Sequence, residues 1–213
     1  MRKTLFPELS DLGASERYER ARQLVNEGLA FAGIFLFPGL FGAFLIGDRI
    51  LALYNTEFSA GATILVLLIL ARIFYVFGGQ LTNAINGLDR PDIAFRINAI
   101  VFSINILGNI ILVYQFGWYG AAVATLFSTG AYLLFSWYKL QEVVKGIQIP
   151  VVEIGYQLAA SVVMVSVLLL LPNTPQNTIF TIGIITVGAS IYSAVLIILS
   201  TRIRKSAVRM LGM

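Results

Sequence analysis

The sequence predicts an all-α membrane protein, a polytopic bundle of six transmembrane helices with both termini in the cytoplasm. Six stretches of about 18–23 residues are uncharged or nearly so, and each can cross a hydrocarbon core of roughly 30 Å as a helix. Of the fifteen Lys and Arg residues, thirteen lie on one side of these stretches, Arg49 lies on the other, and Arg72 lies within a span. The positive-inside rule therefore places both termini in the cytoplasm.

Composition agrees with this class and excludes several functions. Apolar residues make up 58% of the chain and charged residues 12%, about half the charged share of a soluble domain. Cysteine and histidine are both absent, which excludes disulfides, thiolate metal sites and histidine proton relays, and we expect no cofactor. The net charge of +4 does not indicate nucleic acid, because the basic residues lie at loop ends where lipid headgroups are the expected partners.

In chain order, we expect five segments. Residues 1–27 form a cytoplasmic segment with a surface helix, Ser15–Glu27, and contain no signal-peptide h-region, so the first span is expected to act as the insertion signal. Residues 28–138 hold four spans, 139–153 a cytoplasmic linker, 154–200 a terminal helix pair, and 201–213 a basic cytoplasmic tail. The six spans are Gly28–Ile46, Ala60–Thr82, Ile97–Tyr114, Trp118–Tyr138, Ile154–Leu171 and Thr178–Ser200.

Local signals refine these elements. Pro38-Gly39 predicts a kink in the first span. Asp48–Tyr54 has the pattern of a short amphipathic helix at the outer interface. Gly87–Asp92 predicts a tight cytoplasmic turn, and Gln115–Gly117 is so short that the third and fourth spans are expected to pack antiparallel.

The second span carries a polar stripe on its cytoplasmic half. At 100° per residue, four positions fall within about 40° of Arg72; they are Gly79, Asn83, Asn86 and Arg90. A charge near the middle of the bilayer costs at least about 2.5–3.5 kcal/mol, so this face is expected to line the bundle interior or a watery cavity. The alternative is that Arg72 pairs with a carboxylate or with backbone carbonyls and only joins helices.

The third span repeats the pattern with Asn98, Asn105 and Asn109, which share one face. Two interpretations stay open here, because the amides can line a cavity or can join helices by hydrogen bonds of about 1 kcal/mol each. The small residues of Gly120–Thr125 and the hydroxyls of the last span are better explained by close helix packing and by bonds to the preceding turn. No acidic residue lies inside a span, which weakens any ion-coupled mechanism within this chain.

Several segments in order resemble a known family. They are Phe6–Ser10, Ile50–Gly61, Ala84–Pro91, Asn105–Ile110 and Phe116–Thr125. This series is similar to the C-terminal portion of polysaccharide biosynthesis proteins, the Wzx-like oligosaccharide-lipid flippases of the multidrug/oligosaccharidyl-lipid/polysaccharide exporter superfamily. The resemblance implies the last six helices of a fourteen-helix protein with two lobes around a central cavity, so a partner chain or an N-terminal lobe is expected to supply the remaining helices.

The function that this resemblance implies is transport and not catalysis. The chain is expected in the cell membrane as part of a flippase that translocates a lipid-linked oligosaccharide or polysaccharide precursor. Its implied partners are membrane lipids and the lipid-linked glycan, with no nucleic acid. Arg72 would attract the anionic head of the substrate, and the amides would bond sugar hydroxyls; these are Asn83, Asn86, Asn98, Asn105 and Asn109.

Three alternatives remain at this point. A multidrug or cation exporter half of the same superfamily is disfavoured because cationic substrates and coupling ions need membrane carboxylates. An integral membrane enzyme of lipid or glycan synthesis is disfavoured because histidine and cysteine are absent. The third alternative is an inactive or accessory membrane fragment.

Overall fold

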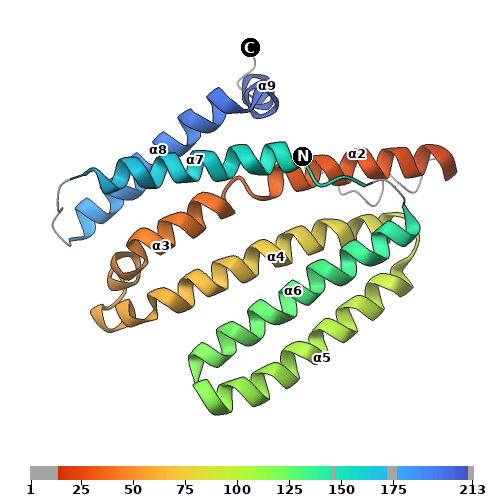
Figure 1. Cartoon of the computed structure of the whole chain (residues 1–213), viewed down its shortest axis with the longest axis horizontal. Coiled ribbons are helices and arrows are strands. Elements are labelled where there is room, and N and C mark those ends of the chain that lie inside the picture. Colours follow the sequence, from red (N-terminus) through yellow and green to blue (C-terminus); the bar gives the residue numbers. More distant parts are fainter. Residues whose placement is uncertain (1–13, 145–146, 172–176, 211–213) are drawn as a thin grey trace. The chain divides into compact units, whose positions relative to one another are not determined.

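The computed structural model describes residues 14–144, 147–171 and 177–210, and all regular elements within these ranges are helices (Figure 1). Six segments are long and apolar enough to cross a membrane, which confirms the predicted six-helix bundle. They are Glu19–Ala52, Thr56–Gly87, Pro91–Phe116, Trp118–Val143, Val151–Leu169 and Thr178–Leu199. The Phe6–Ser10 segment lies outside the described residues, as do residues 145–146 of the linker.

The first span is interrupted next to Pro38-Gly39, as predicted, and the break lies one turn before the proline. Helix α2 (Ala14–Ala32), which contains the expected surface helix, ends before the Pro38-Gly39 pair, and α3 (Leu36–Ala52) begins at Leu36. Pro38 therefore lies in the first turn of α3, where its missing N–H costs no hydrogen bond. In a continuous helix the proline ring would clash with the carbonyl four residues back, which belongs to Ile34 and lies in the break.

A second irregularity separates the residues expected to form an amphipathic helix at the outer interface. Ile46 has φ −132° and ψ 21°, which bends α3 there. Two helical segments meet at this kink, so residues 47–52 form a short helix of their own, as predicted for Asp48–Tyr54, although it ends at Ala52. A short 3₁₀ helix, η1 (Thr56–Gly61), follows, and the Asn55 side chain caps it by accepting a hydrogen bond from the Glu57 N–H at 3.0 Å.

The helices group into two compact units that alternate along the chain. Unit 1 contains Met1–Ala32 and Leu67–Pro150, and unit 2 contains Gly33–Val66 and Val151–Met213. The chain passes from one unit to the other at the break before α3 and again within helix α4 (Ala62–Gly87). The five segments expected from the sequence were defined by their side of the membrane and not by contacts between helices. That division stays a prediction.

In unit 1, two tight turns connect α4, α5 (Pro91–Phe116) and α6 (Trp118–Val143). After α4 the chain forms a Schellman turn, in which the Arg90 N–H bonds the Ile85 carbonyl at 3.2 Å and Asp89 has φ 57°. Pro91 then starts α5, as its fixed φ favours. Gly117 alone joins α5 to α6 with φ 56° and ψ −136°, a backbone conformation that requires glycine and makes the two helices antiparallel neighbours, as predicted.

Small residues bring the helices of unit 1 close together. A Cβ added at Gly120 would overlap the backbone carbonyl of Leu112, so α5 and α6 are in backbone contact near the hairpin. A Cβ at Gly78 would lie 2.7 Å from the Tyr132 ring, and Thr82 and Ser136 share a buried hydrogen bond of 2.8 Å, which joins α4 to α6. The contact at Gly120 confirms the close packing predicted for the small residues at the start of the fourth span.

Unit 2 is built on α3, α7 (Val151–Leu169) and α8 (Thr178–Leu199), and α7 and α8 run side by side (Figure 1). Their core includes Met164, Leu168 and Tyr192, and Leu168 would lie 3.1 Å from a Cβ added at Gly188. Buried Ser200 separates α8 from the basic helix α9 (Thr201–Met210). Its hydroxyl donates to Glu153 at 2.8 Å and accepts from the Ile203 N–H at 3.2 Å, which ties the start of α9 to α7.

Exposed aromatic side chains lie at two helix ends, one in each unit. Around the α5–α6 hairpin, Tyr114, Phe116 and Trp118 are exposed. Around the turn between α3 and η1, Tyr54 and Phe58 are exposed as well. Aromatic rings are enriched at membrane interfaces, and both groups lie at helix ends that the predicted topology places outside.

Candidate functional site

The polar stripe of α4 lies on a face that the structure leaves open. Arg72 and Asn83 are exposed, Asn86 is half-buried, and a Cβ added at Gly79 would meet no atom within 4 Å. On the opposite face Leu81 and Ile85 are completely buried. The helix is therefore amphipathic where the sequence predicted it, with a cation and amides on its uncovered side.

Arg72 makes its contact with an aromatic ring. Its guanidinium carbon lies 5.2 Å from the centroid of the Tyr75 ring, and that ring stacks at 5.6 Å on Tyr132 of α6. Among the residues that the structure describes, no carboxylate lies within ion-pair distance of Arg72. A cation–π contact leaves the guanidinium N–H donors available for an anionic ligand.

The amides of α5 hydrogen bond within unit 1. Asn98 donates to the Ala94 carbonyl at 2.8 Å, and Asn109 donates to the Asn105 carbonyl at 2.8 Å. The Asn105 amide in turn donates to the Ser128 hydroxyl of α6 at 3.0 Å. Asn105 therefore joins two helices, which is the packing role that the sequence left open beside cavity lining.

A groove of about 620 Å³ brings part of the predicted site together. Asn98 and Asn105 line it from α5, Thr125 and Ser128 from α6, and Tyr75 from α4. Apolar and aromatic side chains of α5, among them Phe95 and Phe102, complete the wall. Through Tyr75, the groove adjoins the Arg72 guanidinium, so amides, hydroxyls and one cation meet at one edge of unit 1.

The other predicted site residues lie outside this groove. Asn83 and Asn86 belong to the open face of α4 but do not line it, and Asn109 bonds along α5 instead. Sequence reasoning did not single out Tyr75, although it lies three residues after Arg72, the spacing at which helix side chains meet. It preferred packing for the small and hydroxyl residues of the fourth span, two of which, Thr125 and Ser128, also line the groove.

Six helices that are long and apolar enough to cross a membrane, within the described residues, define a polytopic integral membrane protein. The family model described as "Lipid II flippase MurJ" matches residues 1–204. The chain therefore belongs to the MurJ family of lipid flippases. The sequence resembled Wzx-like flippases, and the family match corrects this to the MurJ family while it confirms the broader expectation of a flippase.

Individual relatives agree with this membership. The chain is 33% identical over 215 residues to "Probable flippase AglR" of Haloferax volcanii, covering 99% of this chain and 45% of that protein. It is 25% identical over 166 residues to "Probable low-salt glycan biosynthesis flippase Agl15" of the same organism, covering 78% of this chain and 35% of that protein.

A solved structure shares the fold. "Lipid II flippase MurJ, inward closed conformation" matches with a TM-score of 0.74 at 19% identity, over 92% of this chain and 42% of that chain. The chain thus spans less than half the length of the relatives it matches.

Proposed function

We propose that this chain forms one lobe of a flippase that moves a lipid-linked oligosaccharide or polysaccharide precursor across the cell membrane. The observation that carries the proposal is the family match over residues 1–204, together with two relatives named as flippases, one of them for glycan biosynthesis. The finer identity that we propose is an oligosaccharide-lipid flippase that acts as the last six helices of a larger two-lobed transporter. The remaining helices are supplied by further protein, in the same chain or in a partner.

Each part of the uncovered polar surface of unit 1 has a role in this proposal. The Arg72 guanidinium attracts the phosphate or acidic sugar of the substrate, because its planar N–H donors suit phosphate and carboxylate oxygens. Asn98 and Asn105 face the groove and offer hydrogen bonds to sugar hydroxyls, while Asn83 and Asn86 extend the polar track along α4. Asn109 supports the track by holding the Asn105 backbone and side chain.

Apolar side chains suit the other half of such a substrate. Much of α5 carries exposed large residues, including Phe102, Ile106 and Ile110, as expected of a helix that faces lipid or a lipid tail. A polar head in the groove and a hydrocarbon tail in the bilayer would then occupy adjoining surfaces. Alternating access between two lobes moves the head while the tail stays in the membrane.

The test is the sidedness of the lipid-linked glycan in the source cells. After disruption of the gene, the glycan is expected to be made but to stay inaccessible to a membrane-impermeant lectin in intact spheroplasts, and to become accessible after lysis. Expression of the complete gene should restore accessibility. Unchanged accessibility in the disrupted strain, with no second flippase expressed, would contradict the proposal.

A further inference from the structure

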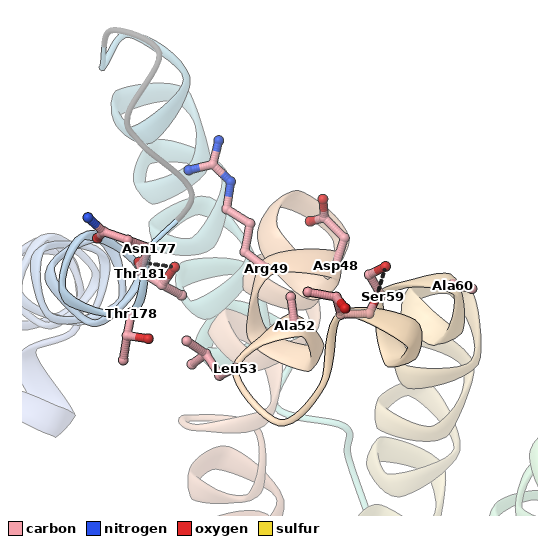
Figure 2. A pocket seen from close by; sticks show the side chains of 10 residues that line it. Asp48, Arg49, Ala52, Leu53, Ser59, Ala60, Asn177, Thr178 and Thr181 are labelled. Atoms are coloured by element: carbon pink, nitrogen blue, oxygen red, sulfur yellow. Dashed lines mark hydrogen bonds between the residues drawn. The ribbon is translucent and has the colours of Figure 1, made fainter.

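Unit 2 contains a second polar pocket, separate from the groove of unit 1. It has a volume of about 510 Å³ and is formed by the end of α3, by η1 and by the start of α8. In Figure 2 the side chains of Asp48 and Arg49 extend from α3, with Thr178 and Thr181 of α8 on one side and Ser59 of η1 on the other.

The pocket offers both hydrogen-bond donors and acceptors. Within the described part of the chain, the Thr178 hydroxyl and the Asp48 carboxylate have no protein hydrogen bond or ion pair. The Ser59 hydroxyl donates to the Thr56 carbonyl at 2.7 Å and the Thr181 hydroxyl to the Asn177 carbonyl at 3.0 Å. Those two donors are occupied, but both oxygens keep lone pairs that can accept a hydrogen bond from a ligand.

The charges of the lining indicate the class of ligand. Asp48 and Arg49 carry opposite charges and are adjacent in sequence, so the lining has no net charge and does not suit a polyanion. A carboxylate, a guanidinium and several hydroxyls around small apolar walls at Ala52 and Leu53 suit a neutral molecule with many hydroxyl groups. A sugar ring has this chemistry, since each hydroxyl both donates and accepts.

The position of the pocket follows from the predicted topology. The first span crosses outward and the last span crosses inward, so the end of α3, η1 and the start of α8 all lie on the outer side. Arg49 is the one Lys or Arg that the sequence places there, against thirteen on the cytoplasmic side. The positive-inside rule does not account for this arginine, and Arg49 is one of the residues that line the pocket.

We propose that this outer pocket of unit 2 binds a sugar residue of the translocated glycan after it has reached the outer side. That the sugar belongs to the translocated glycan rests on the proposed function. That the pocket binds a sugar rests on its lining residues alone. Asp48 accepts from one pair of sugar hydroxyls, and Arg49 and Thr178 donate to others. The pocket would hold the glycan on the outer side and so disfavour its movement back to the cytoplasmic side.

The experiment uses the absence of native cysteine. Ala60→Cys places a reporter in the lining without removing a polar group, and Leu53→Cys provides a second. Glu57→Cys is the matched control, because Glu57 is exposed on the same 3₁₀ helix but does not line the pocket. Each variant is expressed in spheroplasts, and its reaction rate with an impermeant maleimide is measured across a cellobiose series, with betaine as the osmotic control.

Cellobiose is expected to slow labelling at Ala60→Cys and Leu53→Cys but not at Glu57→Cys. Adding Asp48→Asn or Thr178→Ala should raise the half-protecting cellobiose concentration about fivefold to tenfold, the effect of one lost hydrogen bond. Adding Thr186→Ala, an exposed threonine of α8 outside the pocket, should leave it unchanged.

Three results would overturn the proposal: no protection at either reporter, equal protection of Glu57→Cys, or protection by inorganic phosphate in place of cellobiose. Labelling needs no transport, so failure of this site and failure of the flippase proposal are separate outcomes. Loss of protection together with normal glycan sidedness would reject the pocket alone.

Discussion

Replacement of Gly120 by alanine tests the α5–α6 hairpin that forms the groove. Gly120 is buried in the first turn of α6, and the added Cβ would overlap the Leu112 carbonyl, which is backbone and cannot rotate away. Overpacking of this kind costs about 1–3 kcal/mol, and alanine recovers at most about 1 kcal/mol of helix propensity. A net loss of about 1–2 kcal/mol should lower the apparent melting temperature in detergent by about 2–8 °C.

Gly79→Ala is the matched control, since an added Cβ there would meet no atom within 4 Å. Alanine in the interior of α4 should keep the melting temperature or raise it, by up to about 1 kcal/mol of stability. A Gly120→Ala protein as stable as the wild type would show that α5 and α6 do not approach as described. Destabilisation by Gly79→Ala would show that the face of Arg72 is covered.

Two further predictions concern sidedness and access. Reporter fusions after Phe116 should report the exterior and fusions after Asp89 the cytoplasm, and a cytoplasmic signal after Phe116 would refute the six-helix topology. Single cysteines at Gly79 and Asn83 should react with an impermeant thiol reagent, whereas a cysteine at Leu81, which is fully buried, should not; equal labelling of both faces would mean that the polar stripe lines no watery cavity.

The membrane helices could be predicted because the length of an apolar stretch and the charges at its ends can both be read directly from the sequence. The kink in the first span could also be predicted, because the ring of Pro38 disfavours a continuous helix at the carbonyl four residues back. The short helical segment after the kink at Ile46 could be predicted from the amphipathic pattern of Asp48–Tyr54.

The sequence could predict which residues of the candidate site share one face of a single helix, but not how neighbouring helices bring them together. Helical periodicity placed Arg72, Asn83 and Asn86 on one face of α4, and the structure leaves that face open. Whether an asparagine faces a cavity or joins helices depends on the neighbouring helix, and only the packing of α5 on α6 brings Asn105 within 3.0 Å of Ser128. The groove itself is a tertiary feature, so the role of Tyr75 at its edge required the structure.

Transport of the lipid-linked glycan by Arg72 variants tests the central claim most directly. Within unit 1 the described contact of Arg72 is its cation–π interaction with Tyr75, worth about 0.5–1 kcal/mol at an exposed site, so Arg72→Ala should fold and insert with little loss of stability. Measured in the complete transporter and normalised to folded protein, transport should be abolished by Arg72→Ala and partly kept by Arg72→Lys, which retains the charge but not the planar donor group. Arg96→Ala, which removes an exposed arginine outside the groove, should transport normally. Normal transport by a stable Arg72→Ala protein would contradict the assignment of this polar face to the substrate.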